Sequence, residues 1–174
     1  MRLVIFLLVV FPALACVAGW RTYASEQAEA EAGAVLGGKL PPGYRDWKLI
    51  SVAHEEGNLN DFRAVLGNDV AIAAYRKGTL PFPDGAIIAR LAWNYEPSEE
   101  NNKVFGHSQS FVAGAPKNGV QFMVKDAKKY RATGGWGFAQ FDDGKPVGAE
   151  KLKPCFSCHT PVQARDFIFT KYAP

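Results

Sequence analysis

The sequence is poor in cysteine and methionine, and this scarcity narrows what the few such residues can do. Three cysteines and two methionines occur among 174 residues. Cys16 lies in an apolar stretch at the start of the chain, whereas the other two lie within one pentapeptide, Cys155-Phe156-Ser157-Cys158-His159. No further cysteine is left for a structural disulfide, so this pair is expected to serve a local chemical purpose.

Runs of basic residues are missing as well. Arg2 and Arg21 are the only charged residues among the first 24, and without them 18 of the 20 basic residues remain against 17 acidic ones. No cluster of Lys and Arg marks a nucleic-acid partner, and we expect none. With 48% hydrophobic and 21% charged residues, the composition is typical of a globular protein with a packed core.

The start of the chain has the features of a secretory signal peptide, which we expect over residues 1–24. The apolar run at residues 3–11 is short for a membrane span, and Ala13-Leu14-Ala15 forms a small-x-small cleavage pattern. The protein is therefore expected to be exported to the periplasm. Two alternatives stay open, namely an N-terminal membrane anchor and a lipoprotein modified at Cys16.

The remainder of the chain is expected to form a flexible tether over residues 25–39 and one domain over residues 40–174. Branched and aromatic residues bounded by Gly, Pro and Asn predict strands at residues 62–66, 86–93, 108–112, 120–124 and 136–141. Short helices are predicted at residues 70–77, 126–132 and 162–169. The pattern indicates an α+β fold, with an antiparallel β-sheet, short flanking helices and a C-terminal Cys-x-x-Cys-His site.

The pentapeptide is the attachment sequence of a c-type haem. Each of Cys155 and Cys158 can form a thioether with one vinyl group of the haem, and His159 can then coordinate the iron. We expect one covalently bound haem c, in a loop flanked by Pro154 and Pro161. The alternatives are a zinc site, a thioredoxin-like redox pair and a chance match. Zinc would need further ligands, and the redox pair would need a βαβ pattern.

A sixth ligand to the iron is hard to find in this sequence. Fifteen residues follow His159, and none is a methionine. Met123 lies in the apolar segment 120–124, where a core position is expected, and His54 and His107 lie in polar stretches expected at the surface. A five-coordinate iron with an open distal side is typical of proteins that bind or transform small molecules. A plain electron carrier is a further alternative, although it would require that sixth ligand.

Several short motifs occur in the order in which they occur in the cytochrome P460 family, which includes cytochrome c′-beta. They are Tyr44-Arg45-x-Trp47, Phe62-Arg63-Ala64-Val65, Phe82-x-Asp84-Gly85, Val124-Lys125-Asp126, Trp136-x-Phe138, Cys-x-x-Cys-His and Asp166-Phe167-x-Phe169-Thr170. The chain resembles this family along most of its length. The resemblance implies a sheet-rich haem domain that is often dimeric. It also implies that Phe62, Arg63 and the strand at 86–93 surround the distal face of the haem.

Members of the family include hydroxylamine-oxidising enzymes and proteins that bind nitric oxide, and Arg90 separates these two possibilities. The enzymes join a lysine to the haem ring, and the resemblance places Arg90 at that position. Lys77, the nearest lysine upstream, is out of register. A guanidinium stays protonated and is a poor nucleophile. We therefore expect a protein that binds small nitrogen-oxide or diatomic ligands such as nitric oxide. The alternative is an enzyme that oxidises hydroxylamine or a related nitrogen compound and passes electrons to a partner protein.

Arg90 is unusual for its surroundings too, because it interrupts the otherwise apolar segment 86–93. A charge on such a strand is expected to be paired or functional. Two interpretations remain open. Arg90 is either a structural residue, in a salt bridge or at a solvent-facing edge, or a hydrogen-bond donor to a haem propionate or bound ligand.

Overall fold

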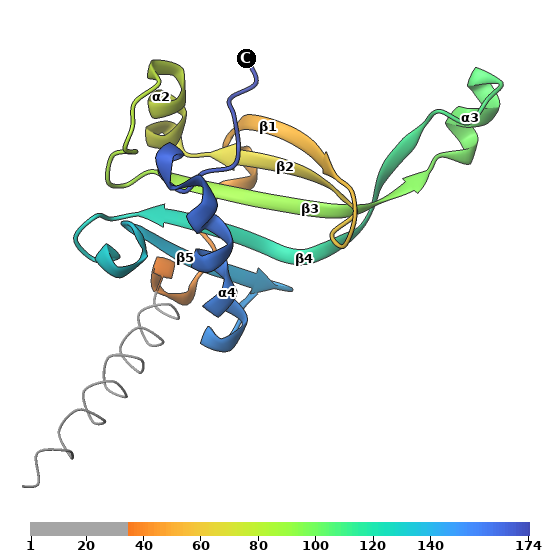
Figure 1. Ribbon diagram of the computed structural model, residues 1–174. Helices are drawn as coiled ribbons and strands as arrows, with labels where there is room; N and C mark the ends of the chain where they lie inside the picture. Colours follow the sequence, from red (N-terminus) through yellow and green to blue (C-terminus); the bar gives the residue numbers. More distant parts are fainter. Residues whose placement is uncertain (1–34) are drawn as a thin grey trace, which may run out of the picture.

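A six-stranded antiparallel sheet with short flanking helices makes up the computed structural model, which describes residues 35–174 (Figure 1). The strands are neighbours in the order in which they occur in the chain. They are β1 (Lys48–Glu55), β2 (Asp61–Gly67), β3 (Ile87–Pro97), β4 (Phe111–Lys125), β5 (Trp136–Asp142) and β6 (Lys145–Pro146). The helices are α2 (Asp69–Lys77), α3 (Glu99–Phe105) and α4 (Ala149–His159), and the 3-10 turns are η1 (Val35–Gly38), η2 (Tyr44–Asp46), η3 (Arg131–Thr133) and η4 (Thr160–Arg165). The predicted α+β class is confirmed.

Most predicted strands are present, but one pair of them is a single element. Strands β2 and β5 match the predictions at 62–66 and 136–141, and the strand predicted at 86–93 is the first part of β3. The strand predicted at 120–124 lies wholly within β4. This strand also contains the last two residues of the one predicted at 108–112, so the prediction of two separate strands is wrong. The pairing register between β3 and β4 shifts on both sides of Trp93, opposite Pro116. Such bulges absorb extra residues without ending a strand.

The helix predicted at 70–77 is confirmed as α2. The side chain of Asn68 accepts a hydrogen bond from the Ala71 N–H, and Gly78 ends the helix with a φ of 64°. The helix predicted at 126–132 is wrong, because a hydrogen-bonded turn and the 3-10 turn η3 replace it before Gly134. The helix predicted at 162–169 is also wrong. Only η4 forms there, and Asp166 and Phe167 then adopt left-handed φ angles that end it.

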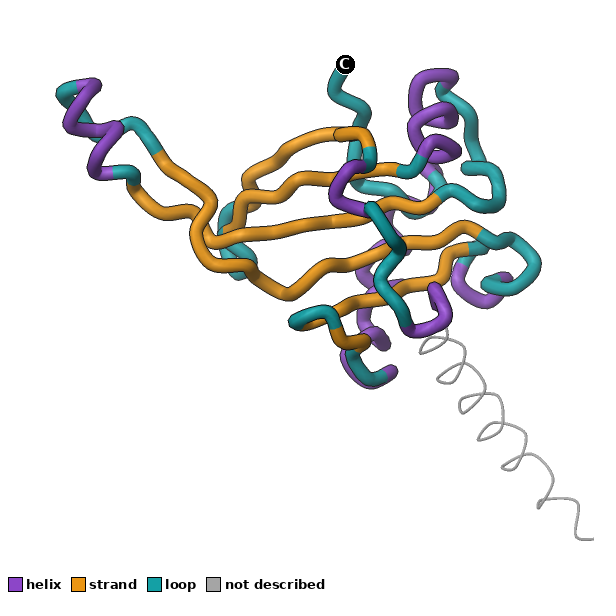
Figure 2. The backbone as a smooth tube through the Cα atoms, turned by 180° about the vertical axis from the view of Figure 1, so that it is seen from behind, coloured by secondary structure: helices purple, strands orange, loops and turns teal. Residues whose placement is uncertain are grey.

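The two faces of the sheet are covered by different parts of the chain (Figures 1 and 2). Helices α2 and α4 and the segment after η4 cover one face, here called the α4 face. Its core comprises Ile50, Val65, Ile72, Ile88, Trp136, Phe138 and Ile168, with Cys155, Phe156 and Met123 packed against it. The other core comprises Val35, Leu66, Ala89, Leu91, Phe122 and Phe141, with Tyr44 and Trp47 packed against it. This division follows from the alternation of side chains along each strand.

One part of the chain lies outside these layers, and another returns to the edge of the sheet. The ends of β3 and β4 continue as a hairpin that carries α3 away from the sheet, here called the arm, residues 95–113 (Figure 1). At the other extreme, the C-terminal segment returns to the edge of the sheet, where the Ala173 N–H donates to the Ile50 carbonyl oxygen at 2.9 Å.

The signal peptide expected at 1–24 and most of the tether expected at 25–39 lie outside the described residues. Within that expected tether, Val35 is buried in the second core, and η1 begins there. Among the helices of residues 35–174, none has the length and apolar character needed to cross a membrane.

Candidate functional site

The pentapeptide forms the last part of α4 rather than the predicted loop, which is a correction. Cys155 and Cys158 are three residues apart and therefore lie on the same side of the helix. Cys155 is half-buried against the α4-face core, Cys158 is exposed, and both are free thiols. Burial raises the pKa of the Cys155 thiol above its ordinary value. The helix thus presents two thiols side by side, one packed and one accessible.

His159, the final residue of α4, is held by its Nδ1 atom. This nitrogen lies 2.7 Å from the carbonyl oxygen of Phe167. Because a carbonyl oxygen only accepts hydrogen bonds, Nδ1 carries the proton and Nε2 keeps a free electron pair. The ring contacts those of Phe138 and Phe169, with centroid distances of 5.4 and 5.0 Å. Burial lowers the pKa of His159, which favours the neutral imidazole that can coordinate a metal, while the bond to Phe167 acts in the opposite direction.

These residues fit a c-type haem by their own chemistry. Two free thiols on one side of a helix can be alkylated by the vinyl groups, and the imidazole that follows offers Nε2 to iron. A zinc site would need further ligands beside the two thiols. Among residues 35–174, no group of three or more His, Cys, Asp and Glu side chains is arranged to hold a metal ion. The antiparallel sheet is also unlike the βαβ arrangement of a thioredoxin-like pair.

The other candidate ligands lie in the positions predicted from the sequence. His54 is exposed on β1, where its ring contacts those of Phe62 and Tyr95. His107 is exposed on the arm and contacts Gln109. Met123 packs against the α4-face core. The predicted surface positions of the two histidines and the predicted core position of Met123 are confirmed.

A buried ion pair lies beside the turn that follows η4. The Lys125 ammonium contacts both carboxylate oxygens of Asp166, at 2.7 and 2.9 Å, and the two side chains are 4% and 8% exposed. The same carboxylate accepts the Phe82 N–H at 2.8 Å, and the Asp166 carbonyl accepts the Trp136 indole N–H at 2.9 Å. Asp166 is thus fixed at both its side chain and its backbone.

A second charged cluster lies on the α4 face around Asp61, whose side chain is fully buried. Arg90 donates to one oxygen of this carboxylate at 2.5 Å, and Arg63 donates to the other at 2.7 Å. Their side chains are 18% and 16% exposed. Arg63 also pairs with Glu55. Burial lowers the pKa of Arg90, as does the charge of Arg63, whereas Asp61 and Glu55 oppose the shift.

A row of amides extends this cluster across the sheet. Arg90 donates to Gln121 at 3.0 Å, Gln121 donates to Gln140 at 3.0 Å, and Gln140 donates to Asp142 at 2.8 Å. Lys151 of α4 completes the row by pairing with Asp142. The polar row lies next to the row formed by Ile88, Met123 and Phe138, as the strand register shows. Phe138 contacts the His159 ring. The polar row is therefore adjacent to the apolar row on which the imidazole packs.

The residues suggested for a distal face are therefore only partly brought together. Arg63 and Arg90 meet at Asp61, on the α4 face. Phe62 does not join them, since adjacent side chains of a strand point to opposite faces. Its ring instead contacts those of His54 and Tyr95.

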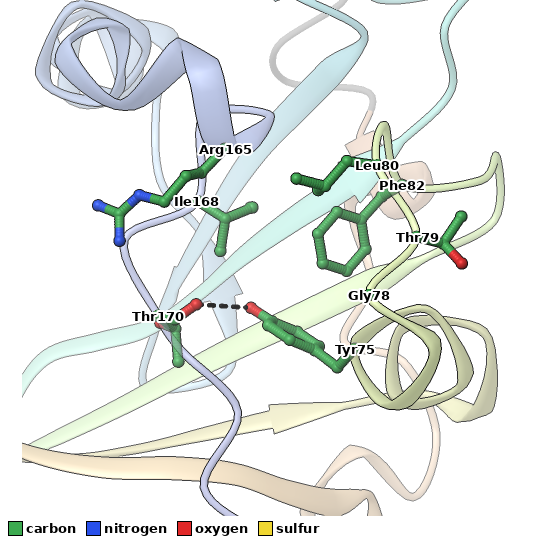
Figure 3. A pocket seen from close by; sticks show the side chains of 8 residues that line it. All are labelled: Tyr75, Gly78, Thr79, Leu80, Phe82, Arg165, Ile168 and Thr170. Carbon is green, nitrogen blue, oxygen red and sulfur yellow. Dashed lines mark hydrogen bonds between the residues drawn. The ribbon is translucent and has the colours of Figure 1, made fainter.

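A cavity of about 170 Å³ lies near the site without including it (Figure 3). It is lined by Tyr75, Gly78, Thr79, Leu80, Phe82, Arg165, Ile168 and Thr170. Across it, the Tyr75 hydroxyl lies 3.4 Å from the Thr170 carbonyl oxygen, and burial raises the pKa of Tyr75. Ile168 and Thr170 line the cavity, whereas Phe169 between them contacts His159. The segment 168–170 therefore borders both.

Three charged residues of the site have partners that the sequence does not indicate. Lys125 and Asp166 stand in motifs that resemble the family, but they are 41 positions apart. Asp61 precedes the motif at 62–65 and is 29 positions from Arg90. The apolar context of Arg90 signals that it needs a partner, and the structure supplies Asp61.

An antiparallel sheet that holds a Cys-x-x-Cys-His helix against one face defines a class of protein suited to c-type haem. Residues 41–170 match the protein-family model described as Cytochrome P460, and the chain belongs to that family. Membership implies haem binding and confirms the resemblance drawn from the short motifs. A search of curated proteins finds no match to this chain.

Proposed function

We propose that this chain is an exported, periplasmic haem c protein that binds a small ligand such as nitric oxide. Cys155 and Cys158 would hold one haem through thioethers, and His159 would be the axial ligand to its iron. The observation that carries the proposal is the 2.7 Å bond from Nδ1 of His159 to the Phe167 carbonyl, since it leaves Nε2 free. Bound haem would supply an iron with one open position for the ligand.

An open position is supported by what the rest of the chain offers. No methionine follows His159. Met123 packs in the core, and the exposed His54 contacts Phe62 and Tyr95. A protein that only carries electrons would need one of these side chains to move toward the iron.

Arg90 is the residue best suited to orient a ligand or a haem propionate. A guanidinium has more N–H donors than its bonds to Asp61 and Gln121 use. Asp61 fixes its position, so little side-chain freedom would be lost on binding. Oxidation of hydroxylamine, with electrons leaving to a partner protein, is the alternative, and it would require a lysine cross-link at the position that Arg90 occupies.

The experiment that tests attachment replaces both Cys155 and Cys158 with Ala. Haem in the wild-type protein is expected to survive acid–acetone extraction and denaturing gels, and haem in the double variant is expected to be extractable. Ser157→Ala, between the two thiols, is the matched control and should keep its haem. Retention of covalent haem by the double variant would contradict the proposal.

Ligand binding is tested by the absorption spectrum of the ferrous protein. A five-coordinate, high-spin spectrum that changes on addition of carbon monoxide or nitric oxide is expected. A low-spin spectrum without added ligand would argue for a carrier, and Met123→Leu would then show whether Met123 is the ligand.

The arm is proposed to contact a second copy of the chain. It exposes an apolar group that includes Val104, which is 80% exposed, together with Phe105 and Phe111. Exposed apolar groups of this kind mark interaction sites. Sedimentation should give a dimer for the wild-type protein and a monomer for a variant carrying Val104→Glu and Phe105→Glu. A monomeric wild-type protein would overturn this part of the proposal.

A further inference from the structure

We infer that Lys125 and Asp166 are positioning residues for His159. Their buried ion pair fixes the turn whose carbonyl oxygen holds the imidazole. Neither of the two side chains is in direct contact with the imidazole ring. The inference rests on the proposed role of His159 as iron ligand, and it adds two residues that determine how strongly that ligand donates.

The first link is the carbonyl oxygen of Phe167. Its direction depends on the backbone at Asp166 and Phe167, which have φ angles of 53° and 63°. Non-glycine residues rarely adopt this left-handed region, and two in succession persist only when their surroundings hold them. Backbone bonds from the Asp166 N–H to Gln163 and from the Phe167 N–H to Val162 close the turn itself, and the contacts of the Asp166 side chain hold it from outside.

The second link is the set of bonds that hold Asp166. Lys125 contacts both of its carboxylate oxygens, and the N–H of Phe82 donates to one of them. The indole of Trp136 donates to its carbonyl oxygen, and the Lys125 ammonium lies 4.9 Å from the centre of the Trp136 ring. Because the pair is buried, its attraction is little screened by solvent.

The third link is steric and runs through Gly134. The Gly134 carbonyl oxygen accepts a bond from Lys125 at 3.2 Å. The ring of Phe167 packs so closely on this glycine that an added Cβ would lie 2.2 Å from a ring carbon. Lys125 therefore contacts two neighbours of Phe167, namely Asp166, which precedes it in the chain, and Gly134, on which its ring packs.

The consequence concerns the electron donation of His159. A ligand histidine that donates its other N–H to a carbonyl is fixed in orientation and becomes more basic. If the turn relaxes, that bond weakens and Nε2 donates less to a metal. Weaker donation stabilises the reduced iron, so the reduction potential rises and the iron–imidazole stretching frequency falls.

The test is a double variant, Lys125→Met with Asp166→Asn, in the haem-loaded protein. Removing one partner alone would leave a buried charge unpaired and destabilise the whole fold, whereas removing both charges avoids that penalty. Resonance Raman spectra of the ferrous protein and its reduction potential are the measurements. Ile72→Val is the matched control, because Ile72 lies in the same core but on a different element, α2, and has no part in the ion pair.

A lower iron–imidazole frequency and a higher potential in the double variant, with neither change in Ile72→Val, are expected. Unchanged values in the double variant would overturn the inference, as would equal shifts in Ile72→Val. If the double variant does not accumulate, Gly134→Ala displaces the Phe167 ring instead, and it should shift both values in the same direction. An absent iron–imidazole band in the wild-type protein would instead contradict the proposed role of His159.

Discussion

The two charged clusters on the α4 face each centre on a buried aspartate, yet they are built differently. Asp166 has one cationic partner, Lys125, and the pair is buried among backbone and aromatic groups. Asp61 has two, Arg63 and Arg90, whose guanidinium groups are partly exposed and continue into a row of amides. The closed pair can anchor a backbone, whereas the open cluster keeps donors available for something else.

The largest effect is expected from Asp166→Ala, which leaves Lys125 buried without its carboxylate. Breaking a pair of this kind costs about 3–5 kcal/mol of stability. Urea unfolding of the haem-loaded protein measures the change. Lys48→Ala removes one partner of an exposed pair with Asp69 and should leave the unfolding midpoint nearly unchanged. Equal effects of the two substitutions would show that burial does not make the Lys125–Asp166 pair more important for stability than an exposed pair.

A smaller loss is expected from Asp61→Ala, on the order of 1–3 kcal/mol. Both arginines lose a partner, but Arg63 keeps Glu55 and Arg90 keeps Gln121. Their partial exposure also lets water reach them. The same unfolding measurement checks this value. A loss above that of Asp166→Ala would show that the open cluster is the more important of the two for stability.

The smallest effect on stability is expected from Arg90→Leu, which leaves Asp61 paired with Arg63. If Arg90 donates to a bound ligand, the affinity for nitric oxide should fall about ten-fold, which corresponds to roughly 1.4 kcal/mol. Haem should stay attached, and the tryptic haem peptide of the wild-type protein should carry two thioether links only. A third bond to a lysine would favour hydroxylamine oxidation, and unchanged ligand binding would leave Arg90 with its structural role alone.

Local sequence was sufficient for the features whose determinants are contiguous. The haem attachment motif is recognised from five consecutive residues, and α2 is predicted from Asn68 and Gly78 at its ends. The antiparallel class followed from strands rich in branched residues between turn residues. The helical state of the pentapeptide was missed because Pro154 suggests a break. Packing of Leu152 and Phe156 stabilises α4 in spite of that proline.

The partners of the site residues depend on distances along the chain that no local pattern contains. That Arg90 needs a counter-charge was evident from its apolar strand, but its counter-charge, Asp61, comes from the neighbouring strand β2. The direction of the Phe167 carbonyl depends on two left-handed residues that are not glycines. Propensity argues against that conformation, and it is held by the backbone bonds to Gln163 and Val162 together with the tertiary contacts of Asp166 and Phe167.

The strand order has a kinetic consequence. Because each strand pairs with its neighbour in the chain, the sheet is built from contacts of short sequence separation, which favours rapid folding. The segment 166–173 is different, since it reaches back to Lys125, Tyr75 and Ile50. We expect its amides to exchange with solvent deuterium faster than those of β2 to β5, through an opening that leaves the sheet intact. Such an opening would free His159 in a chain that has already folded, so that haem could be loaded last.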